Sequence, residues 1–253
     1  MADPFVRTVV LKREEVESFD AYPFSIPAIR QLSELDPGSE VTLLAGENGS
    51  GKSTLIEAVA VALGFNAEGG SRNMSVSTRA SHSSLHECLR VVRGTRSARS
   101  GYFLRAESFF NVATHIEQLD EGPGPGPPII DAYGGVSLHE QSHGESFLSL
   151  ILNRFGPNGL YILDEPEAAL SLQGNLALMR RMHDLVGDGS QFIVATHSPI
   201  LLGYPDARIY VLSDQGIAEA RYEDTEQYEL TRSFLHDRDR FLHYLFSDDS
   251  VSE

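Results

Sequence analysis

The sequence predicts an α/β protein with a mainly parallel sheet, and three stretches carry this prediction. Residues 41–64 have the pattern of a strand, a glycine-rich turn and a helix. Residues 160–163 and 191–196 are short apolar runs, as expected of parallel strands that are buried on both faces. Polar residues follow all three strands, and ligands gather at the carboxyl ends of parallel strands. We therefore expect a ligand site at that edge of the sheet.

The glycine-rich turn carries the motif G-x-x-x-x-G-K-S at residues 46–53. Glycine turns between strands and helices are common, but the complete motif in this context favours nucleotide binding. Backbone N–H groups and the helix N-terminus would wrap the phosphates, and Lys52 would reach the β- and γ-phosphate oxygens. Ser53 would supply a hydroxyl to Mg²⁺. The predicted binding residues are Gly46, Asn48, Gly49, Ser50, Gly51, Lys52, Ser53 and Thr54.

Two adjacent carboxylates follow the apolar run at 160–163. Asp164 would support Mg²⁺ through its water shell, and Glu165 would orient and polarise an attacking water. His197 follows the run at 191–196, from where it can reach a γ-phosphate or the attacking water. The alternative is a charge cluster at the start of a helix, but the position after a buried strand favours a functional pair.

Residues 142–155 predict an amphipathic helix. Ser142 and Glu145 stand in S-x-x-E order before its apolar run, which is a capping-box pattern. A second interpretation is an anion site made by Ser142, the Gly144 backbone and the helix N-terminus. These residues alone favour the plain helix start.

Four stretches together resemble the ABC-type ATPases: GENGSGKST (46–54), QSHGE (141–145), LYILDEPEAALS (160–171) and IVATHSP (193–199). The resemblance covers nearly the whole chain. It implies that Lys52 and Ser53 bind phosphate and Mg²⁺ and that Asp164 supports the metal. Glu165 would be the catalytic base and His197 the switch histidine.

The resemblance also implies a head-to-tail homodimer that sandwiches two ATP molecules. Ser142 and Gly144 would contact the γ-phosphate of a nucleotide held by the partner subunit. In the family a glutamine after the strand at 102–104 touches the metal and the attacking water. This chain has no glutamine there, and Glu107 is the nearest candidate.

Departures from the transporter pattern place the chain within the family. The signature reads QSHGE where transporter subunits usually read LSGGQ, and Glu145 is similar to the SMC-like and recombination-type ATPases. Ser171 stands where many transporter subunits have aspartate. About ninety residues separate Lys52 from Ser142, too few for a long coiled coil. The chain thus resembles a compact, stand-alone ATPase of the SMC/RecF-like branch.

The expected organisation is a single domain over residues 1–253. Residues 1–110 and 156–253 would form the nucleotide-binding lobe, and 111–155 a small helical subdomain. Residues 5–11 predict a strand at an antiparallel edge, and 209–220 a β-hairpin. Residues 109–119 predict a helix, the Pro- and Gly-rich residues 121–128 a mobile connection, and 225–246 one or two closing helices.

The net charge of −16 argues against DNA binding through the overall field of the protein. The charge is uneven, however, because residues 72–105 contain seven arginines against one acid. This stretch could face an acidic partner or nucleic acid, or its arginines could simply be scattered and solvated. The sequence has no apolar run long enough to span a membrane and no recognisable signal peptide, and its single cysteine is Cys88. We expect a cytoplasmic protein.

The favoured function is a Mg²⁺-dependent ATPase acting as a molecular switch, linked to DNA maintenance or to defence. The alternatives are the nucleotide-binding subunit of a transporter and a nucleotide sensor that does not hydrolyse ATP. The implied ligands are ATP and Mg²⁺, with DNA or a protein as a further partner. Tyr22 or Phe24 could stack on adenine, but a core position is favoured for both.

Overall fold

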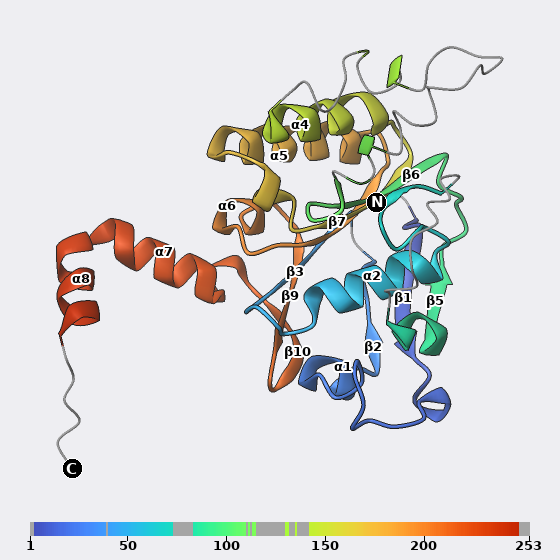
Figure 1. Cartoon of the computed structure of the whole chain (residues 1–253), viewed down its shortest axis with the longest axis horizontal. Helices are drawn as coiled ribbons and strands as arrows, with labels where there is room; N and C mark the ends of the chain where they lie inside the picture. Colours follow the sequence, from blue (N-terminus) through green and yellow to red (C-terminus); the bar gives the residue numbers. More distant parts are fainter. Residues whose placement is uncertain are drawn as a thin grey trace.

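A computed structural model of the chain describes residues 3–38, 40–72, 83–109, 111, 113–114, 130–131, 135 and 142–247. Its main feature is a seven-stranded sheet of order β10-β9-β3-β8-β7-β6-β4 (Figure 1). The five inner strands are parallel, and the edge strands β10 and β4 are antiparallel to their neighbours. The strands are β3 (Val41–Gly46), β4 (Gly70–Ser71), β6 (Ser100–Arg105), β7 (Gly159–Asp164), β8 (Gln191–Ala195), β9 (Arg208–Ser213) and β10 (Gly216–Ala220). The predicted α/β fold with a mainly parallel sheet is confirmed.

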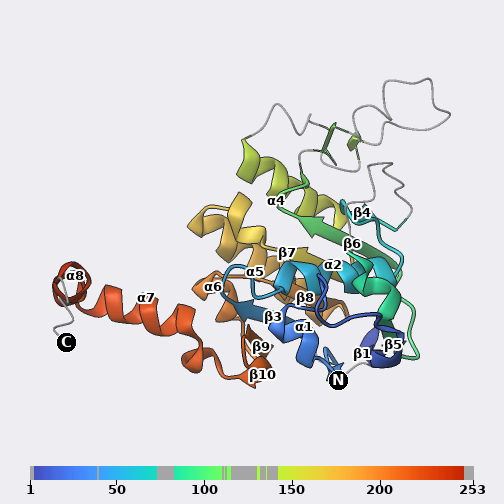
Figure 2. The ribbon, with the colours of Figure 1, turned by 60° about the horizontal axis from the view of Figure 1, so that its bottom comes forward.

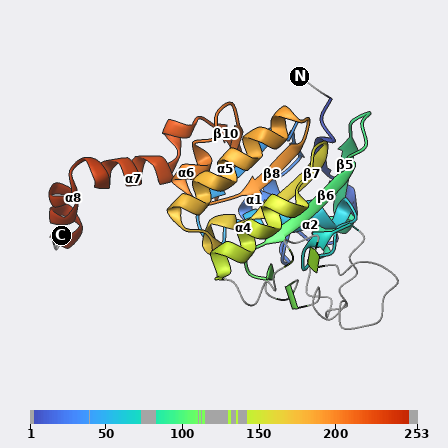
Figure 3. The same cartoon turned by 90° about the horizontal axis from the view of Figure 1, so that it is seen from above.

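Helices cover both faces of this sheet (Figures 2 and 3). One face packs on α2 (Lys52–Ala62), and the other packs on α4 (His143–Arg154), α5 (Leu172–Gly187) and α6 (Pro199–Leu202). Alternate residues of one strand enter opposite cores: Phe103 packs with α2, whereas Tyr102 and Leu104 pack with α4 and α5. Burial on both faces explains why β3, β7 and β8 are continuous apolar runs in the sequence.

A second, three-stranded antiparallel sheet has the order β2-β1-β5. Its strands are β2 (Glu34–Leu35), β1 (Val6–Leu11) and β5 (Leu89–Arg93), and with α1 (Pro27–Gln31) they cover the α2 side. The antiparallel pairing of β1 is confirmed, but the prediction of an edge strand is wrong. β5 pairs with β1 from about eighty residues further along the chain, so β1 is the middle strand.

The predicted capping box is present at the start of α4. The Ser142 hydroxyl accepts from the Glu145 N–H at 3.4 Å, and the Glu145 carboxylate accepts from the Ser142 N–H at 3.0 Å. These bonds satisfy N–H groups that a helix start otherwise leaves without partners.

The C-terminal part of the described chain begins with the predicted hairpin, β9 and β10. Two helices follow, α7 (Glu226–His236) and α8 (Arg238–Phe246). They were expected to close the lobe, but they extend away from its body, and neither has a buried residue (Figure 1). The two helices contact each other, as between the rings of Phe234 and Phe241, whose centroids lie 5.6 Å apart.

Several predictions concern residues outside the described ranges. The connection at 121–128, most of the helix at 109–119 and most of the proposed subdomain at 111–155 belong here, so the division into lobes stays a prediction. Within the described ranges, no helix is long and apolar enough to cross a membrane.

Candidate active site

The loop between β3 and α2 depends on three glycines with positive φ angles: Gly46 at 141°, Gly49 at 81° and Gly51 at 99°. A Cβ atom at Gly46 would lie 2.4 Å from the Leu212 carbonyl oxygen, so a side chain has no room there. Other residues rarely adopt these backbone angles. The glycines therefore let the chain turn tightly and leave the loop backbone open at the N-terminus of α2.

Lys52 is buried at the start of α2 and folds back over this loop. Its Nζ atom donates to the carbonyl oxygens of Gly46 at 2.9 Å and Glu47 at 2.8 Å. Burial lowers the pKa of Lys52, and the nearby carboxylates of Glu165, Asp164 and Glu167 oppose that effect. The ammonium thus lies among the loop carbonyls and within the field of the strand-end acids.

Asp164 ends β7 and is almost fully buried. Burial raises its pKa from the ordinary value of 3.8 to about 6, while Arg105 and a hydrogen bond from Ser53 lower it. Its Oδ1 atom has no hydrogen-bond partner among the described residues. A buried carboxylate oxygen without a partner beside a serine hydroxyl suits a hard cation such as Mg²⁺.

Glu165 and His197 come together from the ends of β7 and β8. Glu165 Oε1 lies 3.2 Å from His197 Nε2. Glu165 has φ 49° and ψ 51°, a left-handed conformation that is unfavourable for a residue with a side chain. Its N–H donates to the Ala195 carbonyl oxygen at 2.9 Å, which holds the strained turn against β8. The structure therefore pairs the two residues that the sequence predicted as base and switch.

Glu167 was missed in the sequence. Its Oε1 atom accepts from the backbone N–H of His197 at 2.5 Å and of Ser198 at 3.1 Å. The carboxylate thereby anchors the turn that presents the His197 ring. An acid two residues after Glu165 was visible in the sequence, but nothing in the spacing pointed to a backbone partner thirty residues away.

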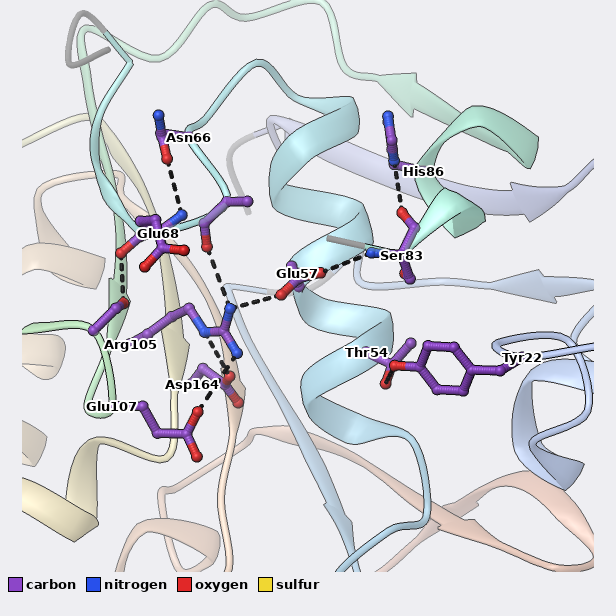
Figure 4. A network of polar contacts seen from close by, with 12 residues as sticks. Tyr22, Thr54, Glu57, Asn66, Glu68, Ser83, His86, Arg105, Glu107 and Asp164 are labelled. Atoms are coloured by element: carbon purple, nitrogen blue, oxygen red, sulfur yellow. Dashed lines mark hydrogen bonds and ion pairs between the residues drawn. The ribbon is translucent and has the colours of Figure 1, made fainter. Parts of the chain in front are cut away.

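Arg105 was also missed, because the sequence grouped it with the arginine-rich stretch. The structure places it at the end of β6 among three carboxylates, those of Glu57, Asp164 and Glu107 (Figure 4). Arg96 likewise serves the fold, since it lies over the Phe5 ring and donates to Asn158 Oδ1 at 2.7 Å. The interpretation as scattered, solvated arginines is therefore wrong for these two residues.

Glu107 contacts Arg105 at 3.9 Å, and its side chain is 89 % exposed. It lines an open pocket of about 500 Å³ that also contains Tyr22, Ser53, Thr54, Glu57, Glu68, Ser83, Arg105, Ser108 and Asn111. A second pocket, of about 400 Å³, contains Gly46, Asn48, Gly49 and Ser50. Six of the eight predicted binding residues in the loop therefore line one of these two pockets, with Ser53 and Thr54 in the first.

The two aromatic candidates differ in their surroundings. Phe24 is buried in the core, as predicted. Tyr22 is 67 % exposed, so the core prediction is wrong for this residue. Its hydroxyl lies 3.4 Å from Thr54 Oγ1 at the wall of the first pocket (Figure 4). A cis peptide bond precedes Pro23 in the same turn.

Comparisons with known proteins bear on the fold of the chain. A family model described as an AAA domain matches residues 17–111. A solved structure described as a metal-chelate type ABC transporter aligns with 91 % of this chain and 89 % of its own, at 17 % identity and a TM-score of 0.51. The chain has the fold of an ABC-type P-loop ATPase. The predicted resemblance to the ABC-type ATPases is confirmed at the level of the fold.

Two curated proteins are similar to this chain in sequence. The cytochrome c biogenesis ATP-binding export protein CcmA of Rhodopseudomonas palustris (strain BisB5) is 29 % identical over 186 residues, which are 68 % of this chain and 85 % of CcmA. The ABC transporter G family member STR2 of Medicago truncatula is 26 % identical over 208 residues, 78 % of this chain. The match spans 28 % of the length of STR2.

Ser142 and Gly144 were predicted to contact the nucleotide of a partner subunit. Neither lines the two pockets described above. Ser142 is exposed, and its hydroxyl donates to Glu145 Oε2 at 2.7 Å. A Cβ atom at Gly144 would lie 3.3 Å from the Ala169 carbonyl oxygen.

A protein-only metal site is absent from the described part of the chain, where no three His, Cys, Asp or Glu side chains are grouped to hold a metal ion. Asp164 with the Ser53 hydroxyl supplies too few ligands to bind Mg²⁺ without further oxygens. Such a partial set is usual where Mg²⁺ also takes substrate phosphates and water.

Proposed function

We propose that this chain binds Mg²⁺-ATP on the loop at residues 46–54 and hydrolyses it at a composite site in a homodimer, acting as a molecular switch. The observation that carries the proposal is the convergence of four groups on one edge of the sheet. Lys52 lies in the field of Asp164 and Glu165, and Glu165 pairs with His197 at 3.2 Å. The ATP-binding description of CcmA supports the choice of nucleotide.

The phosphates would take the place of the loop carbonyls that now hold Lys52. Its ammonium would move from the oxygens of Gly46 and Glu47 to the β- and γ-phosphate oxygens. Ser53 and Asp164 would hold Mg²⁺, which would neutralise charge on the phosphates. Ser50 belongs to the same loop, and its buried Oγ has no hydrogen-bond partner among the described residues, so it is available as a further donor.

Glu165 would act as the general base. Its carboxylate would orient a water molecule and accept its proton as the water oxygen bonds to the γ-phosphorus. The bond between the γ-phosphorus and the bridging oxygen would break at the same time, so that ADP and phosphate leave. His197 would position Glu165 and the γ-phosphate, and Glu167 would hold the His197 turn in place through its two backbone hydrogen bonds. Removal of a general base typically lowers the rate by 10²- to 10⁴-fold.

The first test compares ATP turnover by the wild type and by Glu165→Gln, with Glu34→Gln as an exposed control on β2. We expect Glu165→Gln to lower turnover by at least about 100-fold while ATP still binds, and the control to leave turnover unchanged. Turnover of Glu165→Gln at the wild-type level would remove Glu165 from the mechanism. Binding without phosphate release by the wild type would instead indicate a nucleotide sensor.

The composite site is tested by mixing two inactive variants. Lys52→Ala removes the phosphate lysine, and Ser142→Asp keeps a helix-capping residue but adds negative charge opposite the expected phosphate. A mixed dimer would pair the intact loop of one subunit with the intact Ser142 of the other. We therefore expect mixing to recover ATPase activity, and turnover by the wild type to rise more than linearly with protein concentration. A mixture that stays inactive would contradict the composite site.

Tyr22 is our candidate for the nucleobase contact, since it is exposed at the pocket that contains Ser53 and Thr54. Stacking needs the ring and not the hydroxyl. Tyr22→Phe should therefore keep the wild-type affinity for an ATP analogue, and Tyr22→Ala should weaken it about 5- to 10-fold. Equal affinities for all three proteins would exclude the contact.

A second candidate is the nucleotide-binding subunit of a transporter, which the descriptions of CcmA and STR2 favour. It requires a partner that spans the membrane. Affinity purification of the tagged chain from detergent-solubilised membranes tests this candidate. Recovery of one polytopic membrane protein at a constant ratio would support it, and recovery of DNA or a non-membrane protein would direct the switch elsewhere.

A further inference from the structure

Arg105 stands at a junction of three elements, and only 17 % of its side chain is exposed. Its Nη1 atom donates to Glu57 Oε2 on α2 at 2.6 Å and to the Ala67 carbonyl oxygen at 3.3 Å. Its Nε atom lies 3.4 Å from Asp164 Oδ2 at the end of β7. Its Nη2 atom lies 3.9 Å from Glu107 Oε2, just after β6 (Figure 4).

These contacts are unequal. The bond to Glu57 is short and well formed, whereas the contact with Asp164 lacks hydrogen-bond geometry. Within the described residues, Arg105 Nε and Asp164 Oδ1 have no hydrogen-bond partner. Arg105 is therefore anchored on Glu57 and holds Asp164 only by charge. A contact of this kind compensates the charge of a buried carboxylate, and another cation can still replace the guanidinium.

We propose that Arg105 is the resident counterion of Asp164 when no metal is bound, and that a divalent cation must displace it from Asp164. The inference rests on the proposed function, because it takes Asp164 as the carboxylate that supports Mg²⁺. Arg105 is then a positioning residue, which acts on the metal through Asp164 and does not touch the substrate.

The charges explain the exchange. A buried ionised carboxylate without a counterion is very unfavourable, and a guanidinium is always charged. A metal ion at Asp164 takes over that compensation and repels Arg105 at the same time. Glu57 retains Arg105, and the exposed Glu107 is the carboxylate towards which its Nη2 can turn. Binding of the metal would thus move the Arg105 side chain towards Glu107, in the segment that follows β6.

Competition between the metal and Arg105 predicts that substitutions of Arg105 and of Glu57 have opposite effects on metal affinity. Arg105→Gln removes the competitor, so metal binding should tighten at least about fivefold, the effect of one charge interaction at about 4 Å in water. Glu57→Gln removes the anchor and leaves Arg105 to Asp164, so metal binding should weaken about threefold. Arg105→Lys keeps the charge and should stay near the wild type.

The experiment measures the Kd of Mn²⁺ by electron paramagnetic resonance for the full chain with a saturating, non-hydrolysable ATP analogue. It uses the wild type, the three single variants and the double variant Arg105→Gln/Glu57→Gln. If Arg105 and Glu57 acted on the metal only as separate charges, the effects of Arg105→Gln and Glu57→Gln on the Kd of Mn²⁺ would be additive. Competition predicts that Glu57→Gln has no effect once Arg105 is absent.

An unchanged or weaker Mn²⁺ affinity in Arg105→Gln, or additive effects in the double variant, would overturn the inference. Thermal unfolding and binding of the ATP analogue in the presence of EDTA verify that each variant is folded. Failure of the wild type to bind the analogue would count against the proposed function itself. Normal binding with an Mn²⁺ affinity insensitive to residue 105 would count against this inference alone.

Discussion

Gly46 and Gly49 both have positive φ angles, but the two positions differ in the space around them. A Cβ atom at Gly46 would meet the Leu212 carbonyl oxygen at 2.4 Å and Ser50 Oγ at 2.9 Å, whereas at Gly49 it would meet nothing within 4 Å. Gly46→Ala should therefore destabilise the chain by more than about 2 kcal/mol and abolish binding of an ATP analogue.

Gly49→Ala is the matched control, because it introduces only the backbone strain. That strain should reduce the free energy of unfolding by about 1–2 kcal/mol. Urea unfolding and titration with a fluorescent ATP analogue measure both effects. Equal losses in the two variants would show that crowding at Gly46 is unimportant.

The proposed role of Asp164 in metal binding requires a buried carboxylate, and burying its charge lowers the stability of the folded chain. Burial raises its pKa from 3.8 to about 6, so the folded state binds a proton more tightly than the unfolded state between about pH 4 and pH 6. Stability from this group is therefore greatest at low pH and is lost as the pH rises through about 6. Above that pH the ionised carboxylate costs about 3 kcal/mol.

Asp164→Asn should remove this cost. We expect the variant to be more stable than the wild type by about 2–3 kcal/mol at pH 8, and the gap to close towards pH 4. Urea unfolding at several pH values without nucleotide measures the difference. A gap that is independent of pH would contradict the assignment of the titration to Asp164.

At the scale of elements, the ends of β7 and β8 are held together by the Glu167 side chain and by one hydrogen bond between backbone groups. Glu167 accepts from the N–H groups of His197 and Ser198, and Glu165 donates its own N–H to the Ala195 carbonyl oxygen. A strained turn persists only where its surroundings hold it, as these bonds hold Glu165.

Replacement of Glu167 tests this anchor. Glu167→Ala would leave the His197 N–H without its acceptor, which should lower the free energy of unfolding by about 1–3 kcal/mol. Glu167→Gln keeps the accepting oxygen and should lie within about 1 kcal/mol of the wild type. Unfolding measurements compare the two, and ATP turnover should fall further in Glu167→Ala. An Ala variant as stable as the Gln variant would rule out the anchor.

In the molecule as a whole, the buried core and the exposed C-terminal helices differ sharply in packing. The sheet is buried on both faces, yet α7 and α8 contain no buried residue and expose Leu235, Leu245 and Phe246 by 63–75 %. Removal of residues 238–253 should therefore change the free energy of unfolding of the core by less than about 0.5 kcal/mol. A larger loss, with a lower sedimentation coefficient, would show that these helices pack on a second copy.

The sequence by itself determined the parts of the protein that depend on neighbouring residues. The glycine loop, the capping box at Ser142 and the buried runs of β3, β7 and β8 follow from local backbone angles, short-range hydrogen bonds and periodicity. The order of the polar strand ends also predicted the meeting of Glu165 and His197, because parallel strands end at one edge.

The tertiary structure alone decided the features that depend on distant partners. β1 is a middle strand because β5 pairs with it, Tyr22 is exposed beside Thr54, and Arg105 lies between Glu57 and Asp164, 48 and 59 residues away along the chain. The sequence pattern around each residue is compatible with more than one environment. The packing of the elements decides which environment each residue has, because neighbouring side chains and backbone groups determine its burial and charge compensation.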